Sequence, residues 1–227
     1  MTPARRVVAV VAAWNEEDRV GETVAALRSI EGIGRVVVAD DGSTDATAAA
    51  ARDAGALVVR SERNRGKSAA LAAGVAAAGE ADVVLLADGD LGASAAELAK
   101  VLLPVIEGRA DLAVAAPPRP PVGGFGMVRR AASALVLAAS GHRTDVPLSG
   151  QRAVTVECLR ACRPLAHGFG VDAGMVADAA RLGFRVVEVP AAITHRFTGR
   201  DPAGFRHRGR QGTDILRAMV PRAVGWR

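Results

Sequence analysis

Short runs of β-branched and aliphatic residues alternate with Ala-rich helical stretches along the first half of this chain. The runs predict buried strands, and strands separated by single helices are typical of parallel βαβ units. The predicted strands are 7–11, 35–39, 57–60, 82–87 and 112–115, and the predicted helices between them are 15–30, 43–54, 66–78 and 94–106. This alternation predicts an α/β fold with a doubly wound, Rossmann-like and mainly parallel sheet.

The second half of the chain is less regular. It predicts helices over 127–140, over 172–182 and from residue 214, an extended stretch over 144–156 and a strand over 185–189. Half of the 227 residues are hydrophobic and 23% are charged, as in globular proteins. With no internal repeat and no linker, one domain over 1–227 is the economical interpretation. Cys158 and Cys162, four apart in a helical pattern, are expected in the core rather than in a disulfide or metal site.

No run of eighteen apolar residues occurs, and the N-terminal Val-rich stretch has no signal-peptide cleavage site. We therefore expect a cytoplasmic protein, with a peripheral position on the inner face of the cell membrane left open.

The net charge of +5 is concentrated at one end of the chain. The basic C-terminal segment, residues 196–227, holds eight arginines and two aspartates, so the remaining residues sum to −1. A local excess of arginine disfavours a general nucleic-acid binder and favours an anionic partner such as a diphosphate or a lipid head group. The Arg and Ala bias of a GC-rich genome is an alternative source of part of this charge.

Asp88-Gly89-Asp90 directly follows the predicted strand 82–87. In an extended segment the two carboxylates point to the same side, and Gly89 lets backbone or ligand come close. Hard divalent cations take one or two protein carboxylates and complete their shell with substrate phosphates and water. The motif predicts a cation site that neutralises a diphosphate leaving group, although by itself it fits a solvated turn equally well.

Asp40-Asp41-Gly42-Ser43 ends the predicted strand 35–39 and begins the next helix. A carboxylate here could accept hydrogen bonds from a base edge, while the helix N-terminus offers unpaired N–H groups. Helix capping by Ser43 or Thr44 is the alternative. Both acidic motifs fall at strand C-termini, where ligands bind in doubly wound sheets, and their combination favours binding.

Lys67 follows Gly66 in a cation-containing loop before a predicted helix, a position that suits phosphate contact. The loop is not a Walker loop, because residues 61–65 contain no glycine.

Four motifs in this order and spacing resemble those of glycosyltransferase family 2-like enzymes of the GT-A fold. They are residues 11–17, 40–45, 64–67 and 88–90. The resemblance covers residues 7 to about 115. The later segments 147–153, 168–174 and 195–196 are similar to motifs of glucosyl-3-phosphoglycerate synthases and their relatives.

The resemblance implies a nucleotide-sugar-binding half, residues 1–115, and an acceptor-binding half, residues 116–227. The residues implied to contact the nucleoside or nucleotide are Ala12, Ala13, Glu16, Asp40, Asp41 and Lys67. The residues expected around the diphosphate are Gly89, Arg196 and Arg210, the last in a dense basic stretch for which a solvated charge run is the alternative.

The resemblance also implies a metal ion and a reacting centre. Asp88 and Asp90 would bind Mg²⁺ or Mn²⁺, with His195 as the third protein ligand. Gly150 and Gln151 would line the donor sugar and the acceptor. Asp172 would be the general base if the reaction inverts the anomeric centre; if it retains, as the synthase resemblance suggests, Asp172 would only orient the sugar.

Two positions depart from the family pattern. Ala12 replaces the usual proline before the nucleoside loop, and residues 122–126 differ from the region that recognises phosphoglycerate in the synthases. The second departure indicates an acceptor other than phosphoglycerate. We expect transfer of a hexose from a UDP-sugar, with UDP-glucose favoured and a GDP-sugar second, to a small-molecule or lipid-linked acceptor such as a polyprenyl lipid. A homodimer is left open. The alternatives are a sugar-phosphate nucleotidyltransferase, which would carry a basic loop where this chain has Glu16 and Glu17, or a non-catalytic membrane-surface protein.

Overall fold

The structure is a computed structural model that describes residues 5–117, 125–168, 170–194, 213–214, 216–222 and 224. The strands are β1 (Val7–Ala13), β2 (Ile33–Asp40), β3 (Leu57–Arg60), β4 (Val83–Asp88), β5 (Leu112–Ala116), β6 (Arg152–Thr155) and β7 (Val186–Pro190). The helices are α1 (Val20–Arg28), α2 (Thr47–Asp53), α3 (Lys67–Ala77), α4 (Leu98–Ile106), α5 (Phe125–Ser140), α6 (Val156–Ala161) and α7 (Gly170–Arg181), with a 3₁₀ helix η1 (Gly92–Glu97) before α4.

All seven of these strands join one sheet in the order β3-β2-β1-β4-β6-β5-β7. Every neighbouring pair is parallel except those of β6, which runs antiparallel to both β4 and β5. The predicted single α/β domain with a mainly parallel sheet is therefore confirmed. Strand β6 is reversed because the chain leaves β5 at the carboxyl edge of the sheet and, after the long helix α5, re-enters the sheet at that same edge. Arg152, the first residue of β6, is level with Val114 near the end of β5.

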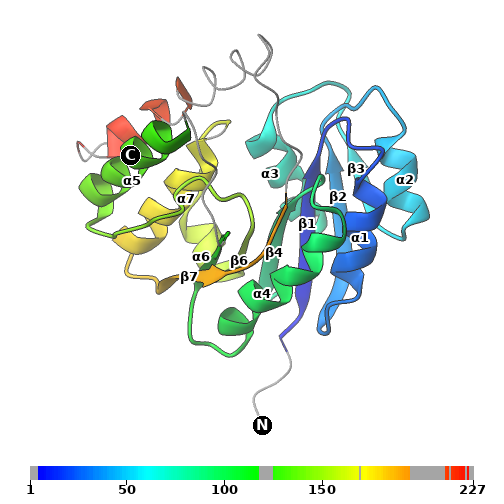
Figure 1. The fold of residues 1–227 in the computed structure, drawn as a ribbon, viewed down its shortest axis with the longest axis horizontal. Helices are drawn as coiled ribbons and strands as arrows, with labels where there is room; N and C mark the ends of the chain where they lie inside the picture. The colour runs from blue at the N-terminus through cyan, green and yellow to red at the C-terminus, as the bar shows by residue number, and fades with distance from the viewer. Residues whose placement is uncertain are drawn as a thin grey trace.

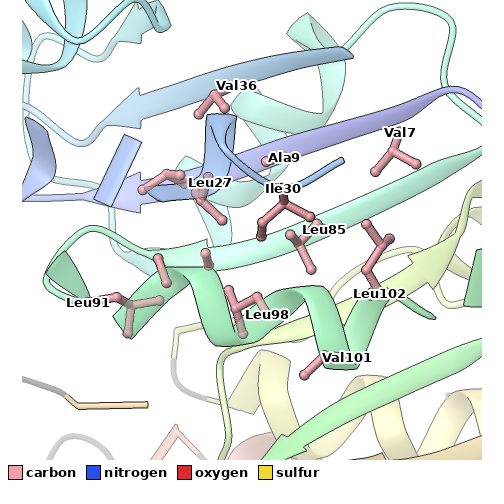
Figure 2. Packing of buried hydrophobic residues seen from close by; sticks show 14 of the residues in the cluster. Val7, Ala9, Leu27, Ile30, Val36, Leu85, Leu91, Leu98, Val101 and Leu102 are labelled. Carbon is pink, nitrogen blue, oxygen red and sulfur yellow. The ribbon is translucent and has the colours of Figure 1, made fainter. Parts of the chain in front are cut away.

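Two helical layers cover the sheet, one on each face (Figure 1). Alternate residues of β1 supply the two cores, because successive side chains of a strand point to opposite faces. Val7, Ala9 and Val11 pack with α1 and α4 in one cluster, which Figure 2 shows around Leu27, Leu98 and Leu102. Val8 and Val10 lie in the second cluster, with residues of α3, α5, α6 and α7. A strand buried on both faces explains why residues 7–11 form a continuous apolar run rather than an alternating one.

Helix α1 begins at Val20, later than the predicted start at residue 15. The intervening residues are held as a loop by the segment after β2. The backbone N–H of Asn15 donates to Ser43 Oγ at 3.0 Å, and that of Glu16 donates to Thr47 Oγ1 at 2.8 Å. Asn15 has a φ of 55°, a left-handed conformation that breaks the helix. These contacts convert the expected first helical turn into a rigid loop at the edge of the sheet.

The helix predicted from residue 214 is present among the described residues at 213–214 and 216–222. It is fixed to α7 by an ion pair between Arg222 Nη2 and Asp178 Oδ2 at 2.8 Å. Cys158 and Cys162 are both buried in the second core cluster, as predicted. Within the described ranges, no helix is long and apolar enough to cross a membrane.

Candidate active site

The carboxyl ends of three parallel strands bring the acidic motifs to one edge of the sheet. In the strand register, Ala12 is level with Asp88 of β4, and Ala13 is level with Asp40 of β2. The end of β1 therefore lies between the two acidic motifs, as expected for the ligand-binding edge of a doubly wound sheet.

The loop after β1 borders this edge. Trp14 is 52% exposed although it follows a buried strand. Asn15, beside it, has a positive φ although it is not a glycine. The side-chain Oδ1 of Asn15 accepts the backbone N–H of Thr44 at 2.9 Å. Trp14 belongs to the motif at residues 11–17, but it is not among the predicted site residues.

Asp40 and Asp41 are both buried, and backbone N–H groups are their main partners. Asp40 Oδ1 accepts the N–H of Ser43 at 2.9 Å, and its Oδ2 lies 3.2 Å from Arg60 Nε. Asp41 accepts the N–H groups of Arg65 at 2.9 Å and Gly66 at 2.7 Å. The pair thus fixes the two loops that follow β2 and β3.

Gly42 permits these two loops to approach. Its φ is 72°, and a Cβ atom built there would lie 2.6 Å from the backbone carbon of Arg63. Any side chain at residue 42 would push the 63–66 loop away from Asp41, so glycine is required for the close contact.

Asp88 lies at the end of β4, and side chains hold both of its carboxylate oxygens. Lys67 Nζ lies 2.8 Å from Oδ1, and Gln151 Nε2 donates to Oδ2 at 2.7 Å. Gly150 allows this grouping, because a Cβ atom there would overlap Lys67 Nζ and lie 2.8 Å from Asp88 Oδ2. The predicted site residues Lys67, Asp88, Gly150 and Gln151 are therefore in contact with one another.

The rest of the Asp88-Gly89-Asp90 motif is fixed through its backbone. Gly89 donates its N–H to Ala12 O at 2.9 Å and accepts the hydroxyl of Thr23 at 2.9 Å. The carbonyl of Asp90 accepts Arg19 Nη1 at 3.0 Å. Gly89 is needed for close approach to β1, since a Cβ atom there would lie 3.0 Å from that of Ala13.

Asp172, in the first turn of α7, reaches the same centre from the second half of the chain. Its Oδ2 lies 3.6 Å from Lys67 Nζ, and its Oδ1 accepts Arg152 Nη2 at 2.9 Å. Arg152 is only 1% exposed and also donates to the carbonyls of Asp172 and Ser149. Arg152 is not among the predicted site residues, although an arginine that begins an otherwise apolar run at 152–154 indicates a buried charge with a partner.

Burial and charge shift the pKa values of this group. Burial raises the pKa of the Asp172 carboxyl above its usual range, while the positive charges of Lys67 and Arg152 oppose that shift. Burial lowers the pKa of the Lys67 ammonium, but the charges of Asp172 and Asp88 outweigh it, so that pKa lies above its usual value. Lys67 is therefore a charged amine at neutral pH, next to two carboxylates.

Three predicted ligand residues, His195, Arg196 and Arg210, lie outside the described residues. The chain just before them returns to the site, because Thr194 N donates to Ser94 Oγ at 3.1 Å, four residues after Asp90. Within the described part of the chain, no group of three or more His, Cys, Asp or Glu residues is arranged to hold a metal ion. A cation at Asp88 and Asp90 would thus need oxygen atoms from substrate and water, or a residue beyond Thr194.

The sequence matches a known family over most of its length. The model of the family described as glycosyl transferase family 2 matches residues 8–159. These residues include β1 to β6 and both acidic motifs. The chain belongs to glycosyl transferase family 2.

Two curated relatives are archaeal. The chain is 32% identical over 198 residues to glycosyltransferase AglJ of Haloferax volcanii, covering 83% of this chain and 63% of AglJ. It is 36% identical over 110 residues to an uncharacterised protein of Methanocaldococcus jannaschii, covering 48% of this chain and 45% of that protein. The chain thus spans about half to two thirds of the length of these relatives.

Among solved structures, the chain is similar to glucosyl-3-phosphoglycerate synthase of Mycobacterium tuberculosis. One structure of that synthase, in complex with Mn²⁺, uridine diphosphate and phosphoglyceric acid, superposes on this chain with a TM-score of 0.81 at 26% sequence identity. The match covers 98% of this chain and 80% of the synthase. A second structure of that synthase, with Mg²⁺ and uridine diphosphate, also has a TM-score of 0.81 and 26% identity. The GT-A fold expected from the sequence is confirmed.

Proposed function

We propose that this chain is a metal-dependent glycosyltransferase that moves a hexose from a UDP-sugar to a small-molecule or lipid-linked acceptor. The main support for the proposal is a set of contacts at the carboxyl edge of the sheet. The Lys67 ammonium lies close to both Asp88 and Asp172, and Gln151 donates a hydrogen bond to Asp88. Membership of glycosyl transferase family 2 supports the reaction class. The complex of the similar synthase with Mn²⁺ and uridine diphosphate supports a uridine donor, and makes UDP-glucose the first one to test.

In this proposal the nucleoside lies over the end of β1. Ala12 and Ala13 supply a small, smooth surface there, and Glu16 is the proposed partner of the ribose. Asp40 and Asp41 act at the border of this pocket by fixing the loops around it, and direct contact of either carboxylate with the base stays a prediction. The support is their common position at one sheet edge.

The metal ion would be held by Asp88 and Asp90, with His195 as the third protein ligand. The donor set fits a hard cation, because carboxylate oxygens suit Mg²⁺ and Mn²⁺. When bound, the metal would neutralise charge on the departing diphosphate. Lys67 and the predicted diphosphate ligands Arg196 and Arg210 would add positive charge, and Gly89 would leave room beside the phosphates.

The donor sugar would lie between Gly150, Gln151 and Asp172. Gln151 fixes the orientation of Asp88 through its amide, and Lys67 and Arg152 favour the ionised form of Asp172. An ionised Asp172 could accept a proton from the acceptor hydroxyl in an inverting reaction, or a hydrogen bond from the sugar in a retaining one. Either role needs the carboxylate that these contacts hold in place.

The acceptor half, residues 116–227, includes the departures from the synthase pattern at 122–126. We propose that the acceptor binds beside Asp172 and that the basic C-terminal segment contacts its anionic group, whether the acceptor is a small phosphate ester or a polyprenyl phosphate. A cytoplasmic location, contact with the membrane surface and a homodimer remain separate expectations.

Thermal unfolding with a panel of donors tests the proposal. UDP-glucose with Mn²⁺ at about a hundredfold its dissociation constant should stabilise the protein by roughly 2.7 kcal/mol. Omission of Mn²⁺ and the variant Asp90→Ala should each abolish the shift, while Asp53→Ala, at an exposed residue of α2, should retain it. A shift that is unaffected by EDTA, or the absence of any shift with UDP- and GDP-sugars, would contradict the proposal.

A further inference from the structure

The Lys67 ammonium contacts the carboxylate oxygen of Asp88 that a bound metal ion would also need to contact. Its ammonium lies 2.8 Å from Asp88 Oδ1, and Gln151 holds the other oxygen at 2.7 Å. The Lys67 side chain is 15% exposed and that of Asp88 is 26% exposed, so water screens this ion pair only partly. A divalent cation that approaches Oδ1 therefore meets a resident positive charge at short range.

Lys67 has a second carboxylate within reach. Asp172 Oδ2 lies 3.6 Å from the same ammonium nitrogen. Gly150 keeps the space around the ammonium clear, because a Cβ atom there would overlap Lys67 Nζ. A small rotation of the flexible lysine side chain would thus replace its contact with Asp88 by a closer contact with Asp172.

The backbone of Lys67 is fixed while its side chain can shift. Residue 67 is the first of α3, and the two residues before it donate their N–H groups to Asp41. Only the side chain is therefore free to move, and its ammonium can pair with either Asp88 or Asp172.

We propose that Lys67 is the resident counter-cation of Asp88 and that the divalent metal binds by displacing it toward Asp172 and the donor diphosphate. The metal alone then binds weakly, because its binding breaks the Lys67–Asp88 ion pair and places it close to the positively charged Lys67 ammonium. The diphosphate compensates for this cost, because its oxygens coordinate the metal and also accept hydrogen bonds from the displaced ammonium. Metal and nucleotide consequently bind with positive coupling, and each raises the affinity of the other by the same factor. This inference rests on the proposed function, since it assumes the cation site at Asp88 and Asp90.

Mn²⁺ titration of the full chain followed by electron paramagnetic resonance tests this inference without any measurement of turnover. Without nucleotide, Lys67→Gln, which keeps a hydrogen-bond donor but removes the charge, should bind Mn²⁺ at least about tenfold more tightly than the wild type. Lys67→Met should do the same, and Lys67→Arg, which keeps the charge, should bind as weakly as the wild type. UDP should tighten Mn²⁺ binding strongly in the wild type and much less in Lys67→Gln.

The outcomes separate the two proposals. Equal or weaker Mn²⁺ binding by both Lys67→Gln and Lys67→Met, with the fold confirmed by circular dichroism, overturns the displacement of Lys67. The proposed function would still stand in that case if the wild type binds Mn²⁺ in the presence of UDP and the Asp90→Ala variant does not. Failure of the wild type to bind Mn²⁺ even with UDP would overturn the proposed function itself.

Discussion

The two acidic motifs end neighbouring regions of the sheet but use their carboxylates differently. At the end of β2, Asp40 and Asp41 accept hydrogen bonds mainly from backbone N–H groups of nearby loops. At the end of β4, Asp88 is held by the side chains of Lys67 and Gln151. Backbone groups cannot leave without unfolding a loop, whereas side chains can rotate away. The first region is therefore a fixed frame, and the second can exchange partners when a ligand binds.

The Asp172 centre extends the second region into the buried interior. Arg152 is almost fully buried and has Asp172 as its charged partner. A buried charge that loses its partner is costly, so this contact should be the most sensitive to mutation. Mutations in the fixed and the exchangeable regions should therefore differ in whether they reduce stability or turnover.

The largest effect is expected for Arg152→Ala. The change leaves Asp172 buried with Lys67 as its remaining nearby cation and opens a cavity under β6. We expect a loss of about 3–5 kcal/mol in the free energy of unfolding, measured by urea denaturation. Arg181→Ala, which removes an exposed arginine of α7, is the control and should change stability by less than about 0.5 kcal/mol. A small loss for Arg152→Ala would mean that Asp172 is not held by this contact.

Asp88→Asn should reduce turnover rather than stability. Asp88 is partly exposed, and Lys67 keeps Asp172 as a partner, so the free energy of unfolding should change by less than about 1 kcal/mol. Hexose transfer from UDP-glucose should fall about a hundredfold or more, since charge on the leaving diphosphate is no longer neutralised. Initial rates and urea denaturation on the same preparation measure both. Loss of stability with retained turnover would reverse the contrast.

Asp41→Ala should show the opposite pattern. The N–H groups of Arg65 and Gly66 lose their acceptor, and because both are only partly buried we expect a loss of about 2 kcal/mol in the free energy of unfolding. Asp41→Asn keeps an acceptor oxygen and should lose less. Hydrogen exchange at residues 65 and 66, followed by NMR, should accelerate in Asp41→Ala. Unchanged exchange would mean that Asp41 does not fix this loop.

The smallest effect is a shift in the acid limb of the pH profile. Because burial raises the pKa of Asp172 above its ordinary value of 3.8, the carboxylate is protonated at pH values where an exposed aspartate stays charged. As pH falls through this raised pKa, kcat/KM should fall, and Asp172→Asn should lose that limb. Asp53→Asn, at an exposed residue, is the control. A limb that is unchanged in Asp172→Asn would assign it to another group.

Sequence patterns predict six of the seven described strands and the position of both acidic motifs, because buried β-branched runs and strand-end carboxylates are local features. The extended stretch predicted over 144–156 contains only the short strand β6 (Arg152–Thr155), and Val156 already begins helix α6. Pairings between distant residues are not local. Nothing in the spacing of Lys67 indicates that its ammonium lies between Asp88 and Asp172, which are 21 and 105 positions away. The late start of α1 at Val20 was missed for the same reason, because Ser43 and Thr47 capture the loop residues that helical propensity would place in the first turn.

The most direct test of the central claim is a crystal structure of the chain with Mn²⁺ and UDP, with the metal located by anomalous diffraction. We expect an anomalous peak in contact with carboxylate oxygens of Asp88 and Asp90, UDP over the end of β1, and the Lys67 ammonium moved from Asp88 toward Asp172 or the diphosphate. A manganese peak away from Asp88 and Asp90, or UDP at another edge of the sheet, would contradict it.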